Sequence, residues 1–199
     1  MLKTLSGHRP SQKEKEITRF LELLKESNHQ SYLEIGARHG DTFYDVVTKT
    51  LPKDGLAVAV DLPGGTWGVK SSEQALKNCV ETLKSEGWTN VHAIFGDSQS
   101  RETVDKILEI SSRYDSILID GDHRYKGVKD DWITYKPLAK NIVAFHDIAG
   151  EGVRQKSNPR LVVEVPRLWR EIKDRFKHEE IIDSVNEPQR PMGIGVLYL

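Results

Sequence analysis

Short apolar runs alternate with amphipathic helical patterns along most of this chain, and this alternation restricts the possible folds more than any other feature. Five apolar runs are typical of buried parallel strands. They are residues 31–36, 56–61, 91–95, 115–120 and 141–146. Helical spacing separates them, over residues 42–50, 72–85, 101–111 and 128–138. Because parallel strands need crossover helices, the sequence predicts an α/β fold, a doubly wound and mostly parallel sheet with helices on both faces.

The two ends of the chain complete this prediction. Residues 17–24 have helical spacing, so residues 1–30 are expected to form an N-terminal helical extension. Residues 147–165 are polar and without periodicity, which predicts a long loop, and a helix follows over 166–176. Two closing strands are expected at 181–185 and 194–199, antiparallel to each other because no helix separates them. We therefore expect one domain, residues 1–199, built on a seven-stranded sheet.

The composition excludes several classes of protein. Lys and Arg total 29 against 30 Asp and Glu, so the net charge of -1 gives no strong sign of a nucleic-acid partner. Neither a signal peptide nor an apolar stretch of membrane-spanning length is evident, so a cytoplasmic protein without membrane association is expected. Cys79 is the only cysteine, which rules out an intrachain disulfide.

An acidic residue stands at the end of each of the first five predicted strands. These residues are Glu34, Asp61, Asp97, Asp120 and Asp147. In open α/β sheets, ligands bind beyond the carboxyl ends of the strands, near the point where the strand order reverses. The acids are therefore expected to gather around one ligand site.

The loop after the first strand favours a cationic ligand over a phosphate. Gly36 and Gly40 would let the backbone approach a ligand closely, and Thr42 opens the next helix. A dinucleotide site would have a glycine where Arg38 stands, and Glu34 would repel a pyrophosphate. This loop therefore disfavours a nicotinamide-dependent oxidoreductase.

The next two strand ends suit a nucleoside. Asp61 lies 25 residues after Gly36, about the separation at which a carboxylate reaches ribose hydroxyls. Asp97, with neighbouring amides such as that of Ser98, could hold an adenine amino group. Groups for glycine-loop, ribose and adenine contacts thus follow one another in chain order.

The segments around 120–123 and 146–147 hold the densest cluster of titratable residues. Asp120, Asp122 and Asp147 should converge at neighbouring strand ends, where their mutual repulsion calls for protons or a cation. Carboxylate oxygens suit Mg²⁺, Ca²⁺ or Mn²⁺, and a nitrogen ligand from His146 would favour Mn²⁺.

These residues carry a family resemblance over essentially the whole chain. The pattern "DG-x-H" at 120–123, together with the acidic strand ends, resembles the class I S-adenosylmethionine-dependent methyltransferases. Within that Rossmann-like class, it is similar to the metal-dependent sugar and catechol O-methyltransferases. The resemblance implies S-adenosylmethionine as cofactor and either Mg²⁺ or Mn²⁺ as an assisting ion. The implied cofactor contacts are Glu34, Gly36, Gly40, Thr42, Asp61, Asp97, Ser98 and Asp120, and the implied metal ligands are Asp120, His146 and Asp147.

The resulting hypothesis is methyl transfer to a hydroxyl of a small-molecule acceptor, a sugar before a phenol. Asp122 or His123 would take the hydroxyl proton as general base. The glycine-rich segment after Asp61 would form a flap in which Trp67 covers the cofactor or the substrate or simply packs. The opening helix could pack on a second subunit of a homo-oligomer.

Two other functions also fit parts of the pattern. Asp120-Gly-Asp122 matches the Asp-x-Asp pattern that holds a nucleotide-sugar through a divalent ion in metal-dependent glycosyltransferases. A binding protein that kept the nucleoside pocket and lost catalysis is the other alternative, and the Asp-Gly-Asp-His cluster argues against it.

Overall fold

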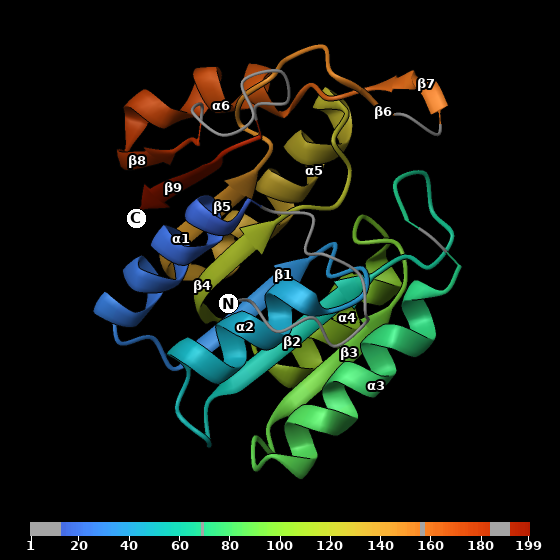
Figure 1. The fold of residues 1–199 in the computed structure, drawn as a ribbon, viewed down its shortest axis with the longest axis vertical. Helices are drawn as coiled ribbons and strands as arrows, with labels where there is room; N and C mark the ends of the chain where they lie inside the picture. The colour runs from blue at the N-terminus through green and yellow to red at the C-terminus, as the bar shows by residue number, and fades with distance from the viewer. Residues whose placement is uncertain (1–12, 69, 156–157, 184–191) are drawn as a thin grey trace.

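The computed structural model describes residues 13–68, 70–155, 158–183 and 192–199 of the chain (Figure 1). Within this part, a seven-stranded sheet has the order β3-β2-β1-β4-β5-β9-β8. Its first five strands are β1 (Ser31–Ile35), β2 (Leu56–Asp61), β3 (Val91–Phe95), β4 (Tyr114–Ile119) and β5 (Ala139–His146). These five pair in parallel. The strand order reverses between β1 and β4, which places a ligand crevice at their carboxyl ends.

The closing strands complete the sheet as an antiparallel pair. Strand β9 (Ile194–Tyr198) runs antiparallel to both β5 and β8 (Lys177–Ile181). The predicted seven-stranded α/β sheet, mostly parallel with an antiparallel closing pair, is thus confirmed. The first closing strand was expected at 181–185, which is wrong, because β8 ends where that prediction began. Its residues 177–180 are mostly polar and solvent-facing at the sheet edge, so no apolar run marks them.

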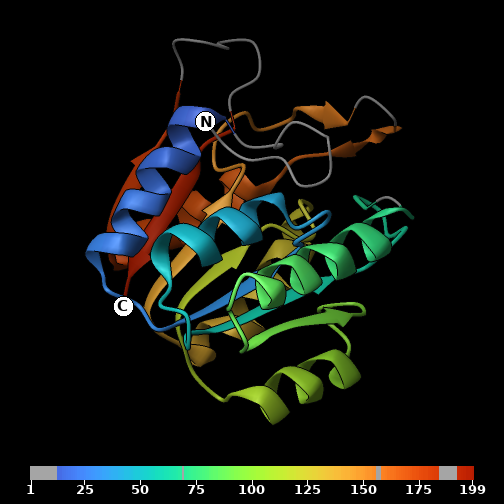
Figure 2. The same cartoon turned by 60° about the horizontal axis from the view of Figure 1, so that its bottom comes forward.

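Helices cover the sheet on both faces (Figures 1 and 2). One apolar cluster joins the sheet to α1 (Glu14–Glu26), α2 (Asp41–Thr50) and α3 (Ser72–Ser85). A second cluster joins the other face to α4 (Arg101–Ile110), α5 (Tyr125–Tyr135) and α6 (Val165–Ile172). Short 3₁₀ turns, η1 (Lys136–Leu138) and η2 (Lys173–Arg175), follow α5 and α6. Apolar side chains on both faces of strands such as β1 and β2 therefore reflect burial between two helix layers.

Among the other predicted segments, one helix and one loop differ most from the structure. The helix expected at 128–138 begins earlier, at Tyr125, and ends as the turn η1 because Pro137 cannot continue the helical hydrogen bonds. The expected long loop at 147–165 contains an antiparallel pair, β6 (Arg154–Gln155) and β7 (Asn158–Val162). Ladder bonds such as Val163 N to Val153 O, at 2.9 Å, hold this hairpin without any apolar alternation.

The N-terminal helix is tied to the closing strands. Glu16 on α1 is fully buried and accepts hydrogen bonds from the backbone of Asp183 at 2.8 Å and of Gly193 at 3.2 Å. The rest of the expected extension, residues 1–12, lies outside the described residues.

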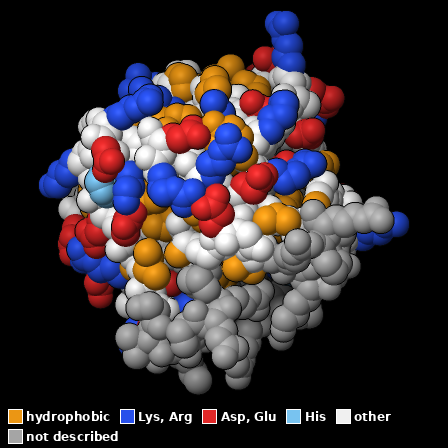
Figure 3. All heavy atoms as spheres, turned by 90° about the horizontal axis from the view of Figure 1, so that it is seen from above, with side chains coloured by type: hydrophobic (Ala, Val, Ile, Leu, Met, Phe, Trp, Pro, Cys, Tyr) orange, Lys and Arg blue, Asp and Glu red, His pale blue; other side chains and the backbone are white. Residues whose placement is uncertain are grey.

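No described helix has the length and apolarity needed to cross a membrane. The face in Figure 3 intersperses basic and acidic side chains.

Candidate active site

A cavity of about 670 Å³ lies at the carboxyl ends of the parallel strands. The five predicted strand-end acids all line it, so the sheet brings them together as expected. Seven carboxylate side chains surround the cavity, against two arginines and three histidines. The acids are Glu34, Asp41, Asp61, Asp97, Asp120, Asp122 and Asp147. An acidic wall of this kind attracts a cationic ligand and repels a phosphate.

The glycine loop brings the ends of β1 and β4 into contact. Gly36 has a φ of 90°, and a Cβ there would lie 2.2 Å from the backbone oxygen of Asp120. Only glycine allows this conformation and approach without displacing the backbone. Thr42 also lines the cavity. Gly40 instead lies behind the loop, where its carbonyl accepts a bond from the Cys79 thiol at 3.4 Å.

Glu34 is a buried carboxyl at the floor of the cavity. It is 2% exposed and accepts a hydrogen bond at 2.7 Å from the hydroxyl of Tyr32 on the same strand. Burial raises its pKa to about 8, and the nearby charges of Asp120 and Asp61 act in the same direction. A ligand that carries a positive charge would reverse this shift by pairing with the carboxylate.

Asp61 closes the cavity on the side of β2. Its Oδ1 accepts from the backbone N–H of Arg38 at 3.0 Å, and its Oδ2 accepts from the hydroxyl of Ser72 at 2.7 Å. Burial raises the pKa of Asp61 despite these two bonds. The carboxylate therefore has a fixed orientation across the ends of β1 and β2.

The loop after β3 presents Asp97 and Ser98 to the cavity. Asp97 is exposed and fixes the loop by accepting from the backbone N–H of Gln99 at 2.9 Å. The Ser98 hydroxyl donates to Asp131 of α5 at 2.8 Å, and the Ser98 carbonyl accepts from Tyr135 at 2.5 Å. Helix α5 thus holds this loop from behind.

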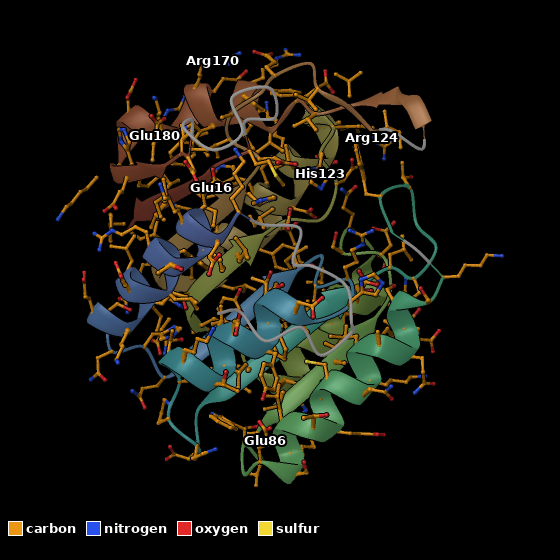
Figure 4. The ribbon with its side chains drawn as sticks, viewed as in Figure 1. Glu16, Glu86, His123, Arg124, Arg170 and Glu180 are labelled. Atoms are coloured by element: carbon orange, nitrogen blue, oxygen red, sulfur yellow. The ribbon has the colours of Figure 1, made fainter. Side chains whose placement is uncertain are left out.

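Two carboxylates and two imidazoles interleave at the ends of β4 and β5. Nδ1 of His123 donates to Oδ2 of Asp147 at 2.8 Å, and its Nε2 lies 3.7 Å from Oδ1 of Asp120. Nδ1 of His146 donates to the same Asp120 oxygen at 3.1 Å. His123 sits in the loop between β4 and α5, as Figure 4 shows. Each imidazole of this cluster is therefore paired with a carboxylate.

This pairing sets the protonation of both histidines. Burial disfavours a charged His146, but Asp120 and Asp147 outweigh it and raise the pKa of His146 to about 10. Burial acts on His123 in the same way, and the hydrogen bond and charge of Asp147 outweigh it, so the pKa of His123 is also raised. The positive charge that three acids were expected to attract is therefore supplied within the protein.

Asp122, the other candidate base, is held by two neighbouring side chains. Its carboxylate accepts from the Arg124 guanidinium at 2.5 Å and from Trp67 Nε1 at 2.9 Å. Burial alone would raise the pKa of Asp122, but the bonds from Arg124 and Trp67 lower it. The Trp67 ring lies over His123, with ring centroids 4.6 Å apart. Asp122 therefore anchors the indole of Trp67 above the imidazole.

The predicted metal ligands do lie together, but their arrangement does not fit a divalent ion. Ligation by His146 through Nδ1 would need a lone pair on the nitrogen that donates to Asp120. Across the described ranges, no three His, Cys, Asp or Glu side chains are grouped so that they could hold a metal ion. Metal ligation by Asp120, His146 and Asp147 stays a prediction that this arrangement does not support.

Sequence reasoning missed two features of this site. It treated Asp147 as a metal ligand, whereas the structure pairs it with His123. It also did not single out Asp131, because the neighbouring acids Asp130 and Asp131 look alike in the sequence. The helical spacing of Asp131 with the apolar Val128 and Tyr135 is a signal that could have identified it as inward-facing.

Comparisons with known proteins assign the chain to a family. A family model described as a methyltransferase domain matches residues 33–148, more than half of the chain. A comparison with curated protein sequences returned no match.

Solved structures share the fold at low identity. An O-methyltransferase from Bacillus cereus, in complex with SAH, has 15% identity and a TM-score of 0.70, over 98% of this chain and 84% of that one. The O-methyltransferase TomG from Streptomyces achromogenes, in complex with SAM, has 13% identity and a TM-score of 0.70, over 94% of this chain and 81% of that one. The family model favours a methyltransferase over the glycosyltransferase and oxidoreductase alternatives. The chain therefore belongs to the methyltransferase domain family, as its resemblance to the class I S-adenosylmethionine-dependent enzymes predicted.

Proposed function

We propose that this chain is an S-adenosylmethionine-dependent O-methyltransferase that methylates a hydroxyl group of a small molecule. The observation that carries the proposal is a strand-end cavity walled by seven carboxylates, with the His123–Asp147 pair beside it. S-adenosylmethionine carries a sulfonium and an ammonium group, so it suits an acidic wall. The SAH and SAM complexes of the two similar O-methyltransferases support the same cofactor.

The cofactor would lie along the strand ends in chain order. Glu34 would pair with the ammonium group, beside the backbone at Gly36 and the side chain of Thr42. Asp61 would accept from the ribose hydroxyls. Asp97 and the backbone of Ser98 would meet the adenine edge, and Asp120 would lie near the sulfonium.

His123 suits the role of general base better than Asp122. Its Nδ1–H donates to Asp147, so the neutral ring presents the Nε2 lone pair for a proton. Asp122 is a weaker base because its pKa is lowered, and Arg124 and Trp67 already occupy its oxygens. In the proposed reaction, the acceptor oxygen attacks the methyl carbon in line, the carbon–sulfur bond breaks, and Nε2 of His123 takes the hydroxyl proton. The products are the methyl ether and S-adenosylhomocysteine.

The acceptor would bind between the flap at 62–68 and the β6–β7 hairpin. Trp67 and Leu62 line the cavity from the flap, and Val153 and Val163 line it from the base of the hairpin. This mixture of an aromatic ring, apolar walls and nearby carboxylates suits a neutral polyhydroxylated ring. A sugar hydroxyl is our first proposal for the acceptor, and a phenolic hydroxyl the second.

No step of this mechanism passes through a metal ion. The family resemblance implies Mg²⁺ or Mn²⁺ as an assisting ion, and such an ion would lower the pKa of the acceptor hydroxyl. In the structure, the Nδ1–H groups of His123 and His146 donate to Asp147 and Asp120, so each of these carboxylates already has an imidazole partner. We therefore assign the proton transfer to His123 alone.

The test is methyl transfer by the purified chain from radiolabelled S-adenosylmethionine to a panel of sugars and phenols. We expect label in a methyl ether and formation of one S-adenosylhomocysteine per transfer. Absence of S-adenosylmethionine binding in calorimetry would overturn the proposed cofactor. Binding followed by transfer only to amines or carboxylates would overturn the hydroxyl acceptor.

A further inference from the structure

Asp131 is a buried carboxyl that the proposed mechanism does not use. It lies on α5 behind the cavity and is 0% exposed. Its Oδ1 accepts from the Ser98 hydroxyl at 2.8 Å. Its Oδ2 has no hydrogen-bond partner among the described residues, and it would lie 3.3 Å from a Cβ placed on Gly121. Burying a carboxyl with one oxygen unpartnered destabilises the folded protein, which suggests that Asp131 is there for a functional reason.

Two side chains of α5 hold Ser98 from behind. Asp131 accepts from its hydroxyl, and Tyr135 donates to its carbonyl at 2.5 Å. Residues 131 and 135 are four apart, so they lie on the same face of the helix, one turn from each other. Both the side chain and the following peptide group of Ser98 are therefore fixed by one rigid element.

The same helix also packs against the loop that carries the proposed base. A Cβ on Gly127 of α5 would lie 2.3 Å from Cγ of Asp122, so this contact requires glycine. Asp122 in turn holds Trp67 over His123. Helix α5 thus sets the relative positions of the loop after β3 and the loop after β4.

We propose that Asp131 is a positioning residue for adenine recognition, acting through Ser98. This inference rests on the proposed cofactor. The 6-amino group of adenine donates and its N1 accepts, so the edge matches the Asp97 carboxylate and the Ser98 backbone N–H. Asp131 itself is too deeply buried to touch the ligand. Asp131 would hold Ser98 in the position from which its backbone N–H donates to N1 of adenine.

The protonation of Asp131 agrees with this role. Burial raises its pKa to about 7, and the charges of Asp122, Asp97 and Asp130 act in the same direction. The neutral carboxyl is therefore accessible near neutral pH. Asparagine copies that neutral form and keeps the oxygen that accepts from Ser98, whereas leucine has a similar size and no acceptor.

The experiment compares two ligands by isothermal titration calorimetry. S-adenosylhomocysteine carries adenine, and S-inosylhomocysteine has a 6-oxo group and an N1–H that reverse the pattern. The variants are Asp131→Leu, Asp131→Asn and Ser98→Ala, with Asp130→Asn as matched control, since Asp130 lies on the same helix and pairs with Lys126 at 2.5 Å.

We expect the wild-type chain to prefer adenine by about tenfold or more, the effect of one well-placed polar contact. Asp131→Leu and Ser98→Ala should lose most of this preference, and Asp131→Asn and Asp130→Asn should keep it. If both ligands weaken equally in Asp131→Leu and in Ser98→Ala, the residues are structural and the inference is overturned. If the wild-type chain binds neither ligand, the proposed cofactor fails, and the inference fails with it.

Discussion

Nδ1 of His123 lies 2.8 Å from Oδ2 of Asp147, and this bond joins the loop after β4 to the end of β5. Asp147 has a φ of 61°, in the left-handed region that residues other than glycine rarely adopt. The backbone therefore turns sharply at the end of β5 where the carboxylate meets the imidazole. A base whose ring is oriented by a third group is the usual arrangement for activating a hydroxyl. Non-glycine residues with such backbone conformations are enriched at functional sites.

Replacing His123 by glutamine should remove the base and leave the cofactor site intact. We expect the His123→Gln variant to lose about 100-fold to 1,000-fold in kcat, the usual contribution of a general base. The affinity for S-adenosylhomocysteine should change little, because His123 is not among the proposed cofactor contacts. Turnover and calorimetric titration of the same preparation measure both quantities. His92→Gln, on β3 and outside the cavity lining, is the matched control. Wild-type turnover in His123→Gln would remove the histidine from the mechanism.

The pH dependence of kcat should report the His123–Asp147 pair. The pKa of His123 is raised, with the bond and charge of Asp147 outweighing burial. Only the neutral ring can take a proton, so kcat should rise with pH through this raised pKa and then level. Asp147→Asn removes the charge that favours imidazolium, so its profile should move to lower pH while the plateau falls. A profile that stays in place, or that moves to higher pH, would contradict the pairing.

Glu34 should couple cofactor binding to proton release. Burial raises its pKa to about 8 in the free protein, whereas an ammonium group bound beside it favours the carboxylate. Below pH 8, binding must therefore expel a proton, and the affinity for S-adenosylmethionine should increase towards pH 8 by at most about tenfold per pH unit. Calorimetry in buffers of different ionisation enthalpy measures the proton directly. Glu34→Gln should bind more weakly and release fewer protons.

The raised pKa of Glu34 also makes the stability of the free protein depend on pH. Because the pKa of Glu34 in the folded protein lies above the usual value of 4.5 for a glutamate, its contribution to stability is full below pH 4.5 and is lost as pH rises through about 8. Glu34→Gln should therefore be more stable than the wild type at pH 9 in denaturant titrations. If the difference in unfolding free energy between Glu34→Gln and the wild type is the same at pH 6 and pH 9, the buried carboxyl is already ionised at pH 6.

Much of the fold was predictable because local signals and burial agree. Strands β2 and β3 and helix α3 have the predicted bounds. Strand β2 shows up as a continuous apolar run because it is buried between two helix layers. Strand β8 escaped prediction because an edge strand with exposed polar residues has no such signature. The gathering of acids at one edge also follows from parallel topology. The topology does not predict which acid pairs with which histidine, because the pairing depends on side-chain angles and on the unusual backbone at Asp147.

Metal ions should have little effect on this enzyme. The imidazole of His146 occupies Oδ1 of Asp120 at 3.1 Å, and that of His123 occupies Oδ2 of Asp147. We expect treatment with EDTA to leave kcat within about twofold, since a twofold change corresponds to about 0.4 kcal/mol. Titration with Mn²⁺, followed by electron paramagnetic resonance, should show no tightly bound ion. Loss of activity in EDTA with recovery in Mn²⁺ would mean that the four side chains rearrange around an ion.

Trp67 should contribute to acceptor binding more than to cofactor binding. Its indole N–H donates to Asp122 at 2.9 Å, and its ring covers His123, so the flap holds an aromatic surface over the base. Trp67→Leu should raise KM for the acceptor by about tenfold or more, because an aromatic contact contributes about 0.5–1.5 kcal/mol beyond its buried area. Asp122→Asn keeps an acceptor for the indole but weakens the pairing with Arg124, so a smaller rise is expected. Steady-state kinetics with S-adenosylmethionine saturating and the acceptor varied separate an effect on acceptor binding from an effect on cofactor binding. Trp88→Phe is the control, since Trp88 is buried away from the cavity beneath Lys53. Should Trp67→Leu weaken cofactor affinity while leaving KM for the acceptor unchanged, the flap would belong to the cofactor half of the site instead.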